Sequence, residues 1–243
     1  MSGIAAVPGL PGGVGVSRLR VYDWPTADGL SGGSPHLHAA SSEAYIVLAG
    51  RGRVQTLSAQ GLATTELEPG TVAWFTPGTV HRLINDDGGL DILTVMSNAG
   101  LPEAGDAVLT FPPEILADPQ SYRRHAALPA SGTEEELADA ARRRRDLALD
   151  GFARLCARAE TDLDGALRGL YEAATTLVAG RIPGWRAIVE AGPSAQVSAT
   201  LEQLELLEGG SAGNMRESRI RTAAHSAERF GMCGRLTVWS GES

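Results

Sequence analysis

The stretch GGSPHLHAASSEAYIVLAGRG, residues 32–52, decides what fold this chain adopts, together with GTVAWFTPGTVHRLIN, residues 70–85. The chain has only five histidines, and three of them fall within these two short segments. Imidazole nitrogens with a carboxylate oxygen suit a divalent transition ion such as Mn, Fe, Ni, Co, Cu or Zn, and suit Ca or Mg poorly. We therefore predict one such ion as the cofactor. Its predicted ligands are His36, His38, Glu43 and His81.

The chain around these segments has the pattern of a β-barrel. Residues 16–111 consist of short apolar runs broken by Gly, Pro, Asn and Asp. Apolar and polar residues alternate within many runs, and turn signals recur every ~8–12 residues, which is typical of an antiparallel barrel or sandwich. Side chains two apart in a strand share a face, so His36 and His38 can both point inward. His81 would come from a distant strand.

The pattern changes to helical periodicity after residue 132. Thr133 and Glu136 form a capping-box sequence, which predicts a helix to about Ala159. A second helix is expected from about Asp162 and a third over 198–208, because leucines there recur at three- and four-residue steps. The late segment GRLTVW predicts a strand.

These patterns divide the chain into five expected parts. They are a flexible N-terminal segment at 1–15, a barrel at 16–112, a linker at 113–132, a helical extension at 133–210, and an irregular tail with a terminal strand at 211–243. The fold class is therefore mainly β, with a barrel followed by an α-helical C-terminal extension.

The two opening segments resemble the two motifs of the cupin superfamily. The first motif corresponds to Gly33, His36, His38, Glu43 and Gly50, with a shorter first spacing than usual. The second corresponds to Gly70, Pro77, Gly78, His81 and Asn85, with Pro77 one place later than usual. The resemblance covers about 90 residues. It implies a small cupin-type jelly-roll β-barrel that holds the metal inside, near one mouth.

Several other residues are candidates for the substrate pocket. Strand alternation could place Tyr45 and Trp74 inside the barrel, although both could equally be ordinary core. Gln55 and Arg82 could meet a substrate carboxylate or hydroxyl. A run of four arginines at 142–145 has no interleaved aromatic residue, so we interpret it as a solvated helix face.

Composition limits the classes of partner. The formal net charge of −8 argues against nucleic acid or an anionic membrane as a partner. No apolar run approaches the roughly 20 residues that span a bilayer, and the first residues do not read as a signal peptide. The two cysteines, Cys156 and Cys233, are far apart, which favours free thiols in a reducing cytoplasm. We expect a cytoplasmic homodimer that binds a small molecule.

The superfamily supports many activities, so the resemblance leaves two functions open. The first is a metal-dependent isomerase, lyase or dioxygenase that acts on a hydroxy or keto acid, a sugar or a catechol, with Glu43 also serving as a catalytic base. The second is a non-catalytic, metal-containing protein that binds or senses a small ligand.

Overall fold

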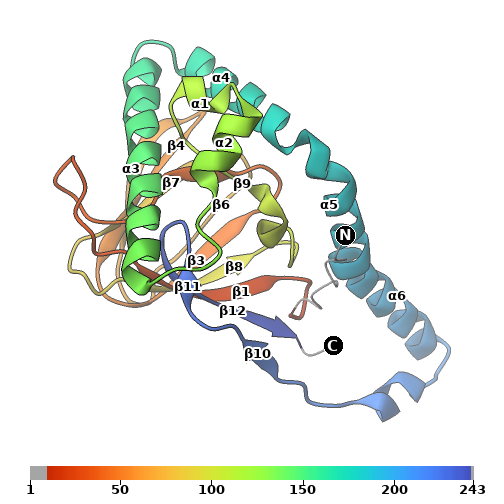
Figure 1. Ribbon diagram of the computed structural model, residues 1–243. Helices are drawn as coiled ribbons and strands as arrows, with labels where there is room; N and C mark the ends of the chain where they lie inside the picture. Colours follow the sequence, from red (N-terminus) through yellow and green to blue (C-terminus); the bar gives the residue numbers. More distant parts are fainter. Residues whose placement is uncertain (1–9, 242–243) are drawn as a thin grey trace.

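Two antiparallel β-sheets face each other and form the body of the protein, whose computed structural model describes residues 10–241 (Figure 1). The strands are β1 (Gly15–Val21), β2 (His36–His38), β3 (Glu43–Ala49), β4 (Gly52–Ser58), β5 (Gly61–Leu67), β6 (Val72–Phe75), β7 (Val80–Asn85), β8 (Asp91–Met96), β9 (Ala107–Leu109), β10 (Ala223–His225), β11 (Arg229–Phe230) and β12 (Gly234–Gly241). The larger sheet has the order β10-β12-β1-β8-β3-β6, with β11 beside β12, and the smaller sheet has the order β5-β4-β7-β2-β9. This arrangement confirms the predicted jelly-roll barrel with a helical extension.

The interior between the sheets follows the alternation of the strands. In β3, Glu43, Tyr45 and Val47 are buried, while the side chains between them are more exposed. Tyr45 and Val47 join an apolar cluster with side chains from both sheets, including Leu83 and Ile92. Each such side chain contributes about 1.5–3 kcal/mol when it is fully buried. Between β3 and β4, Gly50 has a φ of +75°, and a Cβ there would lie 2.2 Å from the Gly89 backbone, so only glycine fits this turn.

Helices cover the outer face of the smaller sheet. The α-helices of the described chain are α1 (Pro113–Leu116), α2 (Pro119–Ala126), α3 (Glu134–Ala159), α4 (Leu163–Val178), α5 (Ile182–Val189) and α6 (Ala195–Glu208). Side chains of α1 to α5 join the apolar cluster on this face, whereas α6 has no buried residue. Leu57 and Val80 on that outer face share one apolar cluster with Phe152 of α3 and Leu170 of α4. The capping box confirms the predicted start of α3, because Thr133 N donates to Glu136 Oε2 at 2.8 Å and Glu136 N donates to Thr133 Oγ1 at 3.2 Å.

The segments outside the barrel differ from expectation in two places. The expected linker at 113–132 contains α1 and α2, and Leu116 and Tyr122 of these helices are buried. The expected flexible segment at 1–15 lies partly outside the described residues, while β1 already begins at Gly15. Among residues 10–241, no helix is both long and apolar enough to cross a membrane.

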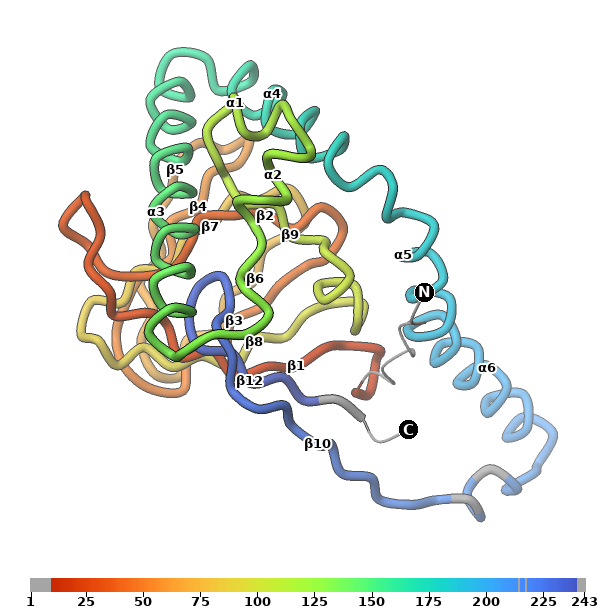
Figure 2. The backbone as a smooth tube through the Cα atoms, viewed as in Figure 1, coloured from red at the N-terminus to blue at the C-terminus, as the bar shows by residue number. Residues whose placement is uncertain are grey.

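The predicted terminal strand closes the larger sheet. β12 runs antiparallel to β1, with Val16 opposite Trp239 and Leu19 opposite Leu236. The chain reaches this position through α5 and α6 on the right of the molecule and a long return along the bottom (Figure 2). A segment from the end of the chain therefore forms part of the barrel wall beside the first strand.

Candidate metal centre

Four buried side chains meet inside the barrel, and all four are those that the sequence predicts as ligands. His36 and His38 lie on β2, Glu43 begins β3, and His81 lies on β7. His36 and His81 are opposite each other in the pairing of β2 with β7. Residues 39–42 carry the chain from the smaller sheet to the larger one, so Glu43 approaches from the opposite wall. Their exposed fractions range from 0% for His81 to 7% for His38 and Glu43.

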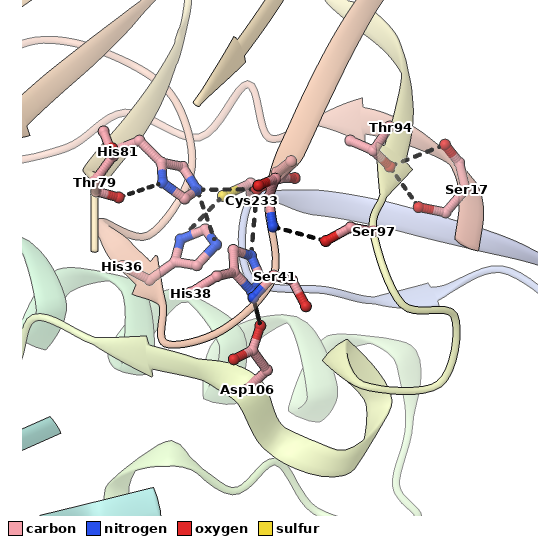
Figure 3. Close-up of polar contacts among 12 residues, drawn as sticks. Ser17, His36, His38, Ser41, Thr79, His81, Thr94, Ser97, Asp106 and Cys233 are labelled. Carbon is pink, nitrogen blue, oxygen red and sulfur yellow. Dashed lines mark hydrogen bonds and ion pairs between the residues drawn. The ribbon is translucent and has the colours of Figure 1, made fainter. Parts of the chain in front are cut away.

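The ligand atoms of these four residues lie within 4.8 Å of one another (Figure 3). The Nε2 atoms of His36 and His81 are 3.2 Å apart. Glu43 Oε2 is 3.2 Å from Nε2 of His38 and 3.2 Å from Nε2 of His81. The cluster could therefore hold one metal ion.

The outer nitrogen of each imidazole has its own acceptor. His36 Nδ1 donates to the Ser34 carbonyl at 2.9 Å, and His81 Nδ1 donates to the Thr79 carbonyl at 3.1 Å. A carbonyl oxygen only accepts, so the hydrogen of each ring sits on Nδ1 and a lone pair remains on Nε2. His38 Nδ1 faces Asp106 Oδ2 at 3.2 Å. Such partners fix the tautomer and orientation of metal-ligating histidines.

These tautomers show that the residues fit a cation. The Nε2 lone pairs of His36 and His81 point at each other, which is unfavourable unless a positive centre lies between them. Although Glu43 Oε2 is close to two rings, it is buried and has no hydrogen-bond donor in suitable geometry. A buried carboxylate oxygen without a donor is costly, and a divalent cation would satisfy it together with the nitrogens.

The pKa values of the cluster depend on burial and on the charges within it. Burial and the neighbouring imidazoles lower the pKa of His36 well below its ordinary value. Burial alone would also lower the pKa of His38, but the hydrogen bond with Asp106 and the negative charges of Glu43 and Asp106 outweigh it and raise this pKa to about 9. Burial opposes ionisation of Glu43, yet contacts with His38 and His81 keep the pKa of its carboxyl below the usual range. In the metal-free protein, the His38 ring therefore keeps both of its nitrogen-bound protons at neutral pH.

Metal binding is expected to strengthen with pH because the metal must displace one of these protons. The apparent affinity should rise about tenfold per pH unit from neutral pH up to the His38 pKa of about 9, and then level off. Affinity rises with pH because the pKa of His38 is raised. Below this pKa a proton on His38 competes with the metal, and above it the ring is neutral. Titrations of metal-free protein across this range in weakly coordinating buffers measure the slope. A flat profile would contradict the role of His38 as a ligand.

Asp106, which the sequence analysis did not identify, supports the cluster from outside. It is 0% exposed, and besides facing His38 it accepts hydrogen bonds from Ala40 N at 2.7 Å and Ser41 N at 3.0 Å. It ends the helical turn Pro102–Asp106, just before β9. Its carboxylate thus ties the chain between His38 and Glu43 to the ring of His38. A lone aspartate about 65 residues from the motif gives no sequence signal of this role.

Asp106→Asn is expected to weaken metal binding by about 10- to 100-fold, the usual cost of losing such a partner. The amide group has only one acceptor oxygen, so its NH₂ must face one of three donors that the carboxylate now satisfies. Chelator competition measures the affinity. Asp91→Asn is the matched control, because Asp91 is also buried but pairs with Arg18 on the larger sheet. Equal effects of the two changes would contradict a specific role for Asp106.

A cavity of about 160 Å³ opens beside the cluster. His36, His38 and Glu43 line it, and Tyr45 contributes to the wall as predicted. Within the described chain, no hydrogen-bond partner is found for the Tyr45 hydroxyl. A larger hollow of about 800 Å³ lies near the ends of β1 and α3 and contains none of the four ligands.

The other three predicted pocket residues lie elsewhere. Trp74 lies opposite Ala44 on the outward face of the larger sheet and is 73% exposed. Its neighbour Phe75 lies opposite Glu43 and faces inward. Gln55 and Arg82 are paired with each other on the outward face of the smaller sheet. There the Arg82 guanidinium binds the Asp28 carboxylate at 2.5 Å. None of the three lines the cavity beside the ligands.

Two groups that line or support the site were not predicted. The ring of Phe75 lies 4.2 Å from that of His81, centroid to centroid, and limits its movement. The hairpin of β11 and β12 forms one side of the cavity through Arg229, Met232, Cys233 and Leu236. Cys233 Sγ is 3.8 Å from His36 Nδ1. Burial raises the pKa of this thiol, so it stays protonated. Both cysteines are free, as expected.

One protein family matches the barrel region of this chain. Residues 27–96 match the family described as "Cupin domain". A search of curated proteins finds no match.

Three solved structures are similar to parts of this chain. A Klebsiella pneumoniae protein with a double-stranded β-helix domain is 19% identical; the match covers 36% of this chain and 68% of that one, with a TM-score of 0.28. A mutant of Bacillus subtilis oxalate decarboxylase is 22% identical over 35% of this chain and 24% of that one, with a TM-score of 0.31. The Streptomyces protein PAC13, with uridine, is 15% identical over 41% of this chain and 69% of that one, with a TM-score of 0.31. The match thus spans only about a quarter of the decarboxylase.

Proposed function

Because this chain is a member of the cupin superfamily, with its cupin domain at residues 27–96, we propose that it is a metal-dependent enzyme acting on a small polar molecule. The observation that carries the proposal is the convergence of three imidazole nitrogens and one carboxylate oxygen inside the barrel. Two of the nitrogens have lone pairs that face each other at 3.2 Å, and the carboxylate oxygen has no donor. The ligands are His36, His38, Glu43 and His81.

The side chains around the cavity have distinct proposed roles. A divalent transition ion at the four ligands would supply Lewis-acid polarisation of a substrate oxygen. The carboxylate of Glu43 is ionised at neutral pH. Its second proposed role is that of a catalytic base, which accepts a proton from the substrate. Burial and the nearby Glu43 raise the pKa of Tyr45 well above its ordinary value, so its phenol remains protonated and can donate a hydrogen bond to the substrate.

The cavity beside the ligands has a volume of about 160 Å³ and is open to solvent on one side. It suits a small polar molecule of the expected classes, a hydroxy or keto acid, a sugar or a catechol. Isomerase, lyase and dioxygenase chemistry all suit such a substrate at this ligand set.

The proposal is tested by elemental analysis followed by assays. Protein purified without a histidine tag should contain about one transition ion per chain, and a chelator should remove both the ion and the activity. Turnover of hydroxy acids, keto acids, keto sugars and catechols is then measured with added metals, beside thermal-shift binding of the same compounds. Protein without stoichiometric metal would contradict the proposal. Binding that responds to metal but gives no turnover would favour the alternative, a non-catalytic ligand-binding or sensor protein.

Three further properties belong to the same proposal. A cytoplasmic location is supported by the two free thiols. The absence of nucleic acid among the partners is supported by the net charge of −8. The third property is a homodimer, which is expected because barrels of this kind commonly pair through their sheet edges.

A further inference from the structure

The turn that joins β11 to β12, residues 231–234, packs against the segment that leads into β2. A Cβ at Gly33 would lie 2.5 Å from the Cys233 backbone, so only glycine allows this close approach. Ser34 is fully buried, and its backbone N and its Oγ both donate to the Met232 carbonyl, at 3.1 Å and 2.8 Å. The turn therefore fixes the position of Ser34 through both its backbone and its side chain.

Ser34 in turn orients one of the four residues of the metal centre. Its carbonyl accepts a hydrogen bond from His36 Nδ1 at 2.9 Å, which leaves the Nε2 lone pair of the ring for the cluster. The Cys233 thiol donates to the same carbonyl at 3.6 Å, and Figure 3 shows this cysteine beside the imidazoles. An acceptor that is itself held in place limits the rotation of a ligating ring. The orientation of His36 therefore depends on where the turn holds Ser34.

Arg144 of α3 holds this turn from outside the barrel. Its Nη2 donates to the Gly231 carbonyl at 2.6 Å, and its Nη1 donates to the Ala126 carbonyl at 3.3 Å. The Gly231 carbonyl also accepts from the Tyr22 hydroxyl at 2.9 Å. In Figure 1 the turn, drawn in blue above β11, lies beside α3. A helix outside the cupin domain thus contacts the wall of the cavity.

Within the described chain, Arg144 is a half-buried cation with no carboxylate beside it. Burial lowers the pKa of its guanidinium, and the groups whose charges act on it are Tyr22, Tyr122 and Cys233. Its Nε atom is buried and has no acceptor among residues 10–241. Taking a charge out of water without a counter-ion costs stability, so an apolar side chain would fill this position at lower cost. The arginine is explained by its directional bond to the turn, which an apolar side chain cannot make.

We propose that Arg144 is a positioning residue for the predicted metal ligand His36. It fixes the Gly231 carbonyl and thereby the turn, and the turn fixes the Ser34 carbonyl that orients the imidazole. The inference rests on the proposed metal centre and assigns a role to the helical extension. The four ligands all lie within the cupin domain at 27–96, but the contacts that orient one of them extend to α3 and to the end of the chain.

Co²⁺ binding tests the proposal through affinity and ligand geometry. Arg144→Met keeps much of the side-chain volume but removes both donors. It should weaken Co²⁺ binding about 10-fold, the lower end of the range for losing a direct partner of a ligand, because Arg144 acts through the turn. The visible absorption bands of bound Co²⁺, which report coordination geometry, should also change, whereas a loss of stability alone would leave them in place. Arg144→Lys keeps a donor for the Gly231 carbonyl and should restore most of the affinity.

Arg145→Met is the matched control from the next position of α3. Arg145 also donates to two carbonyls, those of Trp24 and Pro25, but these belong to the loop after β1. Its replacement should lower stability without changing the affinity or the absorption spectrum of bound Co²⁺, measured well below the melting temperature. Equal effects of Arg144→Met and Arg145→Met on bound Co²⁺ would overturn the proposal.

A double-mutant cycle tests the path through the turn. Ser34→Ala removes the Oγ bond to Met232 but keeps the carbonyl that accepts from His36, and this small truncation also serves if Arg144→Met does not fold. Because both changes act through one turn, their combined loss of Co²⁺ affinity should be smaller than the product of the separate losses. A combined loss equal to that product would place Arg144 outside the path.

The two proposals fail in different ways. Wild-type protein that binds no Co²⁺ would overturn the proposed metal centre and this inference with it. Wild-type protein that binds Co²⁺, with the affinity and the absorption spectrum unchanged by Arg144→Met and by Ser34→Ala, would overturn this inference alone.

Discussion

His81→Ala is expected to abolish stable metal binding. His81 is fully buried, its Nε2 lies 3.2 Å from both the His36 nitrogen and the Glu43 oxygen, and no other side chain can replace it there. Loss of an outer partner of a ligand costs about 10- to 100-fold in affinity, so loss of the ligand itself should cost more than ~100-fold. Elemental analysis after dialysis, and the shift in melting temperature on adding metal, both measure this effect.

The control for this change is another histidine. His125→Ala alters an exposed residue on α2 whose ring bonds only within its own helix, so metal content should not change. Melting curves in chelator show whether the His81 variant still folds. If it folds and retains one metal ion per chain with wild-type affinity, the metal centre does not involve His81 and the assigned ligand set is wrong.

Arg145→Met is expected to lower the free energy of unfolding by about 2–6 kcal/mol, because two carbonyl groups lose their donor at a cost of about 1–3 kcal/mol each. Arg145 is 2% exposed on α3, and it donates to the carbonyls of Trp24 at 2.9 Å and Pro25 at 3.0 Å. Methionine preserves most of the volume but donates no hydrogen bond, so both carbonyls lose their partner. Urea unfolding followed by circular dichroism measures the difference.

Arg143→Met provides the matched control from the same run of arginines. Arg143 is exposed, and the described residues include no ion-pair partner for it, so its replacement should change stability by no more than about 0.5 kcal/mol. Equal losses for the two variants would mean that the contacts of Arg145 with the loop after β1 do not stabilise the fold.

The four arginines at 142–145 do not form the solvated helix face that was expected of them. Charge pattern alone predicted a solvated helix face for 142–145, but the structure buries Arg145 and stacks Arg142 on Trp24, 4.5 Å from the ring centroid. Arg144 donates to the carbonyl of Gly231 at 2.6 Å. The acceptors are backbone carbonyls of distant loops, and these have no signature in a sequence. The run is therefore a docking surface between α3 and the barrel.

The cluster of His36, His38, Glu43 and His81 could be predicted because the spacing of these residues is itself the signal. Two histidines two apart share a strand face, and the nearby glycines mark the turns that bring β3 and β7 together. Trp74 could not be placed in this way. Alternation shows that Trp74 and Phe75 point in opposite directions, but it does not show which one faces inward. That choice depends on the register with β3, where Phe75 is opposite Glu43.

The larger sheet joins two strands, β1 and β12, that are synthesised at very different times. A ribosome synthesises β1 early and β12 after the helices, yet the two strands are neighbours in the finished sheet. During translation, β1 therefore waits with one edge unpaired, and the cavity lacks the side formed by Met232 and Cys233. The four residues of the candidate metal centre are all synthesised before this side of the cavity. The chain therefore carries the whole cluster before the segment that completes the cavity has been made.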